Sequence, residues 1–159
     1  MELEAFFLTT AEISVVLIGF VTIFLTFVMS GREIGKVDRM HSRALLTGAY
    51  PLLVVPFVPV AANAYGASEA TALLSFHLAG GLASVMIGIV MTGFYSRLSR
   101  AEVREVGWIY TLVSFTLGWG AGGFFWADAL GYAPAGNAVV AVILSFLLTG
   151  TVLFSFAAQ

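Results

Sequence analysis

The stretch ATALLSFHLAGGLASVMIGIVMTGFYS, residues 70–96, contains no Asp, Glu, Lys or Arg. A bilayer core about 30 Å thick is crossed by a helix of roughly 20 apolar residues, so this stretch is long enough to span a membrane. Other stretches are similarly apolar, and the first of them, residues 5–29, contains one acidic residue, Glu12. The whole chain is 60% hydrophobic and 10% charged, with a mean hydropathy of +0.99. These values lie outside the range of soluble globular proteins.

The apolar stretches predict an all-α integral membrane protein, a bundle of five transmembrane helices that forms a single domain over residues 1–159. We expect the spans near residues 6–29, 44–64, 70–95, 106–127 and 138–158. Strands of a membrane barrel are about 10 residues long and alternate in polarity. The stretches here are much longer and apolar at consecutive positions, which favours helices. A version with four spans would require one stretch to be re-entrant.

The basic residues predict the orientation of the bundle. All seven lie in two short segments, residues 30–43 and 96–105. They are Arg32, Lys36, Arg39, Arg43, Arg97, Arg100 and Arg104. In a five-span chain these two connections share one side of the membrane, and the positive-inside rule makes that side cytoplasmic. We therefore expect the N-terminus outside and the C-terminus inside. Ser99 and Glu102 form a capping-box pattern, which predicts that the fourth helix begins at Arg100.

Several classes of function are excluded or disfavoured by composition. The chain has no cysteine, which excludes disulfides, thiolate metal sites and cysteine nucleophiles. The glycine-rich segment 118–123 resembles a nucleotide-binding loop only in composition, because it lies inside an apolar stretch with no strand before it. His41 falls in the cytoplasmic segment and has no acid and nucleophile beside it. The net charge of −2 carries no nucleic-acid signature, so we expect no nucleic-acid partner. Because no catalytic or ligand set is recognisable, we also expect no cofactor, no metal ion and no enzymatic activity.

The second span contains three of the four prolines, Pro51, Pro56 and Pro59. Each removes a backbone donor and frees the carbonyl four residues earlier. Those carbonyls belong to Thr47, Leu52 and Val55. Because carbonyls in lipid need partners, this helix is expected to be bent and to face protein or water at that point. The bend is either a static kink for packing or the hinge or gate of an ion path.

Small and polar residues recur along single faces of the spans. On the first span they follow steps of three, four or seven, which places them on one face. These residues are Thr9, Glu12, Gly19, Thr22, Thr26 and Ser30. We expect this face to contact other helices or water rather than lipid. Small residues four apart also let helices approach closely. The candidates for such packing are Gly19, Gly80, Ser84, Gly88, Gly118 and Gly122.

Glu12 and His77 are ionisable residues within predicted spans, and such residues are functional candidates by default. Both are expected on polar faces at similar depth, which makes a contact between them geometrically plausible. Asn63, Glu69 and Asp128 are expected on the same outer side and could form a polar vestibule. Three interpretations stay open for the pair: a structural bond between the first and third helices, a proton- or cation-binding site, and a metal or haem site shared within an oligomer.

One resemblance to known proteins rests on the first span. The pattern Ala11-Glu12, six residues, then Gly19-Phe20 is similar to the first helix of a loosely defined group of short, uncharacterised bacterial membrane proteins. The similarity covers about a fifth of the chain. It implies a multi-pass protein of the bacterial cytoplasmic (inner) membrane and a role for Glu12, and it implies no activity.

Two functions follow as expectations. The first is ion or proton permeation or transport, with Glu12 as the titratable site, His77 as its partner and the proline-bent helix as the gate. The alternative is a non-catalytic subunit that binds or stabilises a larger membrane protein complex. Transport predicts that water reaches Glu12, whereas the subunit role predicts a dry Glu12 and a large apolar contact patch. In both cases the lipid bilayer is a partner, and a homo-oligomer or a larger complex is expected.

Overall fold

The computed structural model describes residues 3–30, 33–131 and 136–157, and all regular structure in these ranges is helical. The helices are α1 (Leu3–Ser30), α2 (Lys36–Val54), α3 (Phe57–Ala64), α4 (Glu69–Tyr95), α5 (Arg100–Val106), α6 (Trp108–Ala129) and α7 (Gly136–Ala157). Arg32, one of the basic residues of the predicted cytoplasmic segment, lies outside the described residues. The all-helical fold is the one that the apolar stretches predicted.

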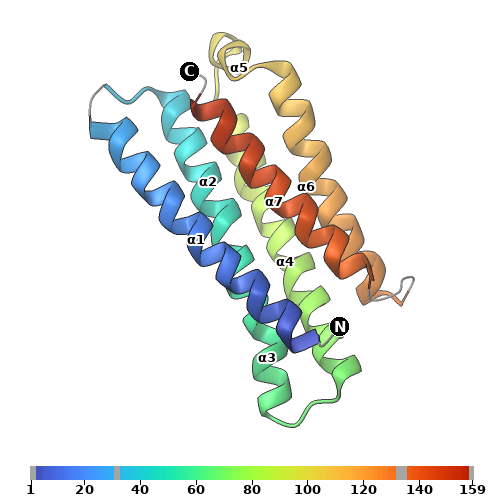
Figure 1. Ribbon diagram of the computed structural model, residues 1–159. Coiled ribbons are helices and arrows are strands. Elements are labelled where there is room, and N and C mark those ends of the chain that lie inside the picture. The colour runs from blue at the N-terminus through green and yellow to red at the C-terminus, as the bar shows by residue number, and fades with distance from the viewer. Residues whose placement is uncertain (1–2, 31–32, 132–135, 158–159) are drawn as a thin grey trace.

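The long helices lie lengthwise in one elongated bundle, with α3 at one end and the short α5 at the other (Figure 1). Four helical segments are long and apolar enough to cross a membrane, which indicates a membrane protein. They are Glu4–Val28, Lys36–Ala64, Glu69–Tyr95 and Gly136–Ala157. Helix α6 has 22 residues but is not among them. Its glycines and tryptophans contribute little to hydropathy, so the fifth span stays a prediction.

The outer surface of the bundle is strongly apolar. On α4, for example, Leu82, Met86 and Ile89 are exposed, and on α7 Leu147 and Phe154 are exposed. Soluble monomers rarely expose continuous apolar surface of this kind. A hydrocarbon environment removes the cost of such exposure, in agreement with the membrane assignment.

The second predicted span is interrupted where the prolines predicted a bend. Helix α2 ends at Val54, and α3 begins after Pro56, which takes the N-cap position. The carbonyl of Leu52, which Pro56 frees, accepts a hydrogen bond from Ser14 Oγ of α1 at 2.9 Å. The carbonyl of Val55 accepts one from the Val58 N–H at 3.2 Å. The break is therefore stabilised by α1 on one side and by its own next turn on the other.

The capping box predicted at Ser99 is confirmed. The Ser99 N–H donates to Glu102 Oε2 at 2.7 Å, and the Glu102 N–H donates to Ser99 Oγ at 3.3 Å. The expectation of one continuous fourth helix from Arg100 was wrong. The helix is broken at Gly107, whose φ of +87° lies in a region that side chains disfavour. The break separates the short α5 from α6.

The two basic segments meet at the same end of the bundle. Lys36 Nζ at the start of α2 lies 3.4 Å from Glu102 Oε1 of α5. The guanidinium carbon of Arg43 lies 5.5 Å from the centre of the Phe94 ring of α4. A buried apolar cluster that includes Val37 packs these elements together. We call this the basic end of the bundle.

Candidate functional site

A buried histidine–aspartate pair lies near the other end of the bundle, between α4 and α6. His77 Nε2 is 3.0 Å from Asp128 Oδ2, and both side chains are 3% exposed. The distance is that of an ion pair, but the imidazole is not oriented to make a hydrogen bond to this oxygen. We therefore treat the contact as electrostatic. A charged group buried in this way is expensive unless it has a partner.

The pair is held in place by α7 and by aromatic rings. Asn137 Nδ2 donates a hydrogen bond to Asp128 Oδ1 at 3.0 Å, which ties α7 to α6. The ring of Phe76 lies 5.5 Å from the His77 ring and the ring of Phe125 lies 6.2 Å from it. The polar side chains of His77, Asp128 and Asn137 thus link α4, α6 and α7 next to two aromatic rings.

Glu12 is not the partner of His77, contrary to the contact considered from the sequence. Its side chain is exposed on the outer surface of α1, whereas His77 faces Asp128 inside the bundle. The whole polar stripe of α1 is exposed in the same way. Its threonine hydroxyls at positions 22 and 26 need no other helix because they bond locally: Thr22 donates to the Ile18 carbonyl and Thr26 to the Thr22 carbonyl, each at 2.8 Å.

The predicted vestibule is only partly assembled. Asp128 is buried against His77 rather than open to water. Glu69 is exposed in the first turn of α4, and Asn63 is half-buried in α3. No hydrogen bond or ion pair joins Asn63 or Glu69 to the His77–Asp128 pair in the described part of the chain. In the same ranges, no three His, Asp or Glu side chains are placed to hold a metal ion.

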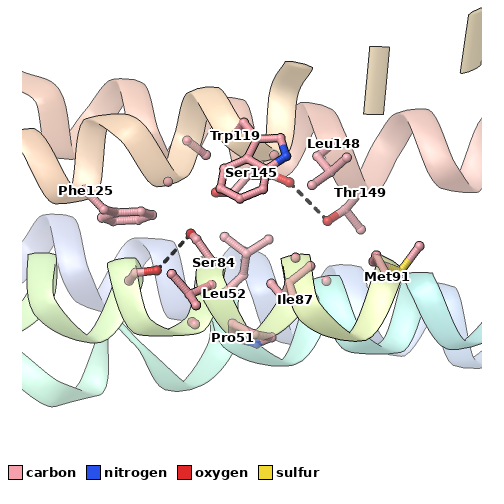
Figure 2. Close-up of a pocket in the computed structure, with 18 of the residues that line it drawn as sticks. Pro51, Leu52, Ser84, Ile87, Met91, Trp119, Phe125, Ser145, Leu148 and Thr149 are labelled. Carbon is pink, nitrogen blue, oxygen red and sulfur yellow. Dashed lines mark hydrogen bonds between the residues drawn. The ribbon is translucent and has the colours of Figure 1, made fainter. Parts of the chain in front are cut away.

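A cavity of about 340 Å³ lies among α2, α4, α6 and α7. Its end near the His77–Asp128 pair is lined by Phe76 and Phe125, the same rings that contact His77. Its other end reaches Tyr95 and Tyr110, toward the basic end. Figure 2 shows the two walls facing each other across the space, with Trp119 on one side. The cavity thus runs along the bundle from the histidine site toward the basic end.

The wall of this cavity is almost entirely apolar. Its hydroxyl groups largely bond to their own helices, as the dashed lines in Figure 2 indicate. Ser84 donates to the Gly80 carbonyl at 2.9 Å, and Thr149 donates to the Ser145 carbonyl at 3.1 Å. Ser145 itself donates to the Ala141 carbonyl at 2.8 Å. A continuous polar path for an ion is therefore not provided by this wall.

The packing glycines of α4 and α6 lie at close helix contacts. A Cβ on Gly80 would be 2.5 Å from the Phe125 ring, and one on Gly122 would be 3.1 Å from Ser84 Cβ. Gly88 faces Trp119 and Gly118 faces Leu148 at ordinary contact distances. Gly19 differs from the expectation. It is exposed on α1 with no atom within 4 Å of a Cβ built there, so it does not pack inside the bundle.

The predicted hinge residues lie beside the cavity. Pro51 and Pro56 contribute to its wall, and Pro59 is buried in α3. The break in the second span therefore helps to shape the space, since the interrupted helix cannot fill it as a straight one would.

Two buried residues were missed from the sequence. His41, assigned to a cytoplasmic connection, is 0% exposed within α2, and its ring lies 5.2 Å from Tyr110 and 5.7 Å from Phe156. Neither nitrogen of His41 has a hydrogen-bond partner among the described residues. Ser14, which bonds to Leu52, was not singled out. Ser14 lies to one side of the polar stripe of α1, and nothing in the sequence indicated that its hydroxyl would contact the carbonyl freed by Pro56.

The comparisons with known proteins give no relative. No protein-family model, curated protein or solved structure matches this chain.

Proposed function

We propose that the protein is a non-catalytic membrane subunit that assembles through the outward face of α1, and that its partner at this face is a second copy of the chain. The observation that carries the proposal is the position of Glu12. It is the ionisable residue in the middle of an exposed helix face that also carries large apolar side chains such as Val16 and Ile23, which are 73% and 60% exposed.

An isolated carboxylate at this position is unfavourable in lipid. Glu12 lies about 13 Å along the axis from the start of α1, at 1.5 Å per residue. An ionised carboxylate near the bilayer centre costs about 2.5–3.5 kcal/mol on insertion scales. All seven basic residues lie in the segments 30–43 and 96–105, so none is placed to neutralise Glu12 within the same chain. A neighbouring helix that offers a hydrogen bond would remove most of the cost.

The exposed residues around Glu12 form a seam suited to a second helix. Seven exposed positions follow steps of three, four or seven, a period near 3.5 that keeps one line of residues facing a partner helix. This outer stripe consists of Ala5, Glu12, Val16, Gly19, Ile23, Thr26 and Ser30. Gly19 leaves room for a close approach, because nothing of its own chain covers it. The buried face of α1, with Phe7 and Val21, points the opposite way.

A second copy fits this seam because twofold symmetry places identical residues opposite each other. Two Glu12 side chains would then meet, and the hydroxyl of one carboxyl group could donate a hydrogen bond to the other. The resulting hydrogen bond satisfies both groups without a basic residue. We place this subunit, with five spans, its N-terminus outside and its C-terminus inside, in the bacterial inner membrane.

Cysteine crosslinking tests the proposal directly, because the chain has no cysteine of its own. Val16→Cys and Ile23→Cys lie on the outer stripe and should form disulfide-linked dimers in native membranes. Ile13→Cys is the matched control, since Ile13 is also exposed but lies about a quarter turn away from the stripe. Equal crosslinking of the control, or adducts of Val16→Cys with a protein of different mass, would contradict assembly with a second copy.

Glu12 variants provide the second arm. Glu12→Gln keeps a hydrogen-bonding pair and should dimerise about as well as the wild type, measured by single-molecule photobleaching in liposomes over a range of lipid dilution. Glu12→Ala should dimerise about tenfold more weakly, the effect of an interhelical hydrogen bond worth 1–2 kcal/mol. Unchanged dimerisation of Glu12→Ala would remove Glu12 from the interface.

Proton or cation transport is a second candidate, favoured by the buried His77–Asp128 pair rather than by Glu12. In this case Asp128→Asn should abolish proton-driven flux in liposomes at unchanged expression and assembly, whereas Glu105→Gln, an exposed control on α5, should keep it. Absence of flux from the wild-type protein under every imposed gradient would rule this function out.

A further inference from the structure

We propose that the cavity among α2, α4, α6 and α7 binds one acyl chain of an anionic phospholipid, with the headgroup at the basic end of the bundle. The volume of about 340 Å³ falls in the range of small-molecule sites. The site is distinct from the α1 face and does not depend on the assembly proposed above.

The chemistry of the wall selects a hydrocarbon. Apolar cavities of this size do not hold water, because a buried water needs two to four polar partners. The hydroxyls of Ser84, Ser145 and Thr149 already donate to carbonyls of their own helices. Ser114 Oγ lines the cavity without a hydrogen-bond partner among the described residues, but a single such group does not supply the two to four partners that a buried water needs. A polar ligand would therefore lose its hydration without compensation. A hydrocarbon chain has no hydrogen bonds to water that it would lose on entering the cavity. Lipids that surround the bundle supply such chains.

The charges near the inner end select the headgroup. Ala44 and Tyr95 line the cavity there, and the residues before them are Arg43 and Phe94. The Arg43 guanidinium lies over the Phe94 ring, 5.5 Å from its centre, and is exposed. It is therefore held beside the wall with its charge available. A phosphate at this position would meet a cation, and a basic residue near an anionic headgroup contributes about 1 kcal/mol.

The other end of the cavity provides a stop for the chain. The rings of Phe76 and Phe125 lie 5.5 Å apart and close the space beneath the His77–Asp128 pair. An acyl chain that enters from the basic end would terminate against these rings. Its headgroup would then stay at the basic end, where Arg43 and Lys36 lie.

Photolabelling in nanodiscs tests the proposal. The probe is phosphatidylglycerol that carries a diazirine on one acyl chain, and the labelled residues are identified by mass spectrometry. We expect labels at Thr149 and Ala121, which line the cavity and are almost fully buried from the outer surface. Labels at the exposed Leu82 and Ile89 report ordinary lipid contact and serve as the internal control. Labels at the control residues alone would overturn the proposal.

Variants that fill the cavity supply the second arm. Gly88→Leu and Gly48→Leu project into the space from α4 and α2, where a Cβ meets its nearest neighbours at 3.8 Å and 3.6 Å. Each should lower labelling inside the cavity at least fivefold and leave the labels at the outer surface unchanged. Gly93→Leu is the matched control on α4, since Gly93 does not line the cavity. If both filling variants keep full internal labelling, the chain does not occupy this space.

The headgroup is tested by comparing probes. Labelling of the cavity by phosphatidylglycerol should exceed labelling by phosphatidylcholine about fivefold, and Arg43→Gln should remove that preference. Equal labelling by the two phospholipids, or labelling only by a free diazirine fatty acid, would contradict an anionic phospholipid as the occupant.

Discussion

Replacing Ser14 with alanine removes the hydroxyl that joins α1 to the interrupted second span. Ser14 is 0% exposed, and its Oγ lies 2.9 Å from the Leu52 carbonyl that Pro56 deprives of its normal donor. The same hydroxyl also lies 2.7 Å from the Thr10 carbonyl of its own helix, so it divides its single proton between two acceptors. Alanine at this position leaves the Leu52 carbonyl without a partner in the interior.

The expected loss follows from this geometry. An unsatisfied buried acceptor costs about 1–3 kcal/mol. Interhelical hydrogen bonds in a membrane are worth about 0.6 kcal/mol on average and about 1.7 at most. Because the Ser14 proton is shared with Thr10, we expect Ser14→Ala to lower the free energy of unfolding by about 1–2 kcal/mol, within the range that both considerations allow.

A double-mutant cycle isolates this interaction. Pro56→Ala restores an N–H that can donate to the Leu52 carbonyl four residues earlier. In that background the further change Ser14→Ala should cost less than about 0.5 kcal/mol, which gives a coupling energy near 1 kcal/mol. Unfolding is followed by tryptophan fluorescence during SDS titration in mixed micelles. The control Ser75→Ala removes a hydroxyl that bonds within its own helix, to Ala72 at 2.7 Å, and should change little. An equal cost of Ser14→Ala in both backgrounds would refute the reasoning.

Three further predictions concern a helix contact, a helix cap and the pH dependence of that cap. Gly80→Ala should destabilise the bundle by about 1–3 kcal/mol in the same titration, because its Cβ would be 2.5 Å from the Phe125 ring. Gly93→Ala, with nothing within 4 Å, should be neutral or stabilising, and equal effects would contradict the close approach of α4 and α6. Ser99→Ala should lower hydrogen-exchange protection of α5 by about fivefold, the loss of an N-cap worth about 1 kcal/mol. The hydrogen bond from the Ser99 N–H holds the pKa of Glu102 below its usual value. Protection of α5 should therefore be complete at pH values above the usual glutamate pKa and should fall as the pH drops through the lowered pKa of Glu102. Glu102→Gln should abolish this pH dependence. If the dependence persists in that variant, Glu102 is not its source.

Local features of the helices could be predicted because they depend on near neighbours in the chain. The apolar stretch 70–96 corresponds to α4, Ser99 caps α5, and the second span breaks at Pro56. Each follows from interactions within about four residues. The break at Gly107 could not be predicted in this way. A single glycine at the start of an apolar run is compatible with either a continuous helix or a break at positive φ.

The functional site could be predicted only in part. His77 was identified as a buried ionisable residue, but its partner is Asp128 and not Glu12. The sequence gives the angle of each side chain around its own helix, whereas the partner depends on the rotation and axial position of two helices relative to each other. The local hydroxyl bonds of Thr22 and Thr26 removed the need for the polar face of α1 to point inward. His41 was missed because its burial depends on Phe156, more than a hundred residues away.

The sequence alone determined that the chain is helical, apolar enough for a bilayer and basic in only two segments. Periodicity and proline chemistry act over one or two turns, so they can be read without coordinates. Only the tertiary structure decided which polar groups meet, that Glu12 faces outward and that a cavity separates the helices. These features arise because the faces through which two helices pack depend on contacts between side chains that are distant in the sequence.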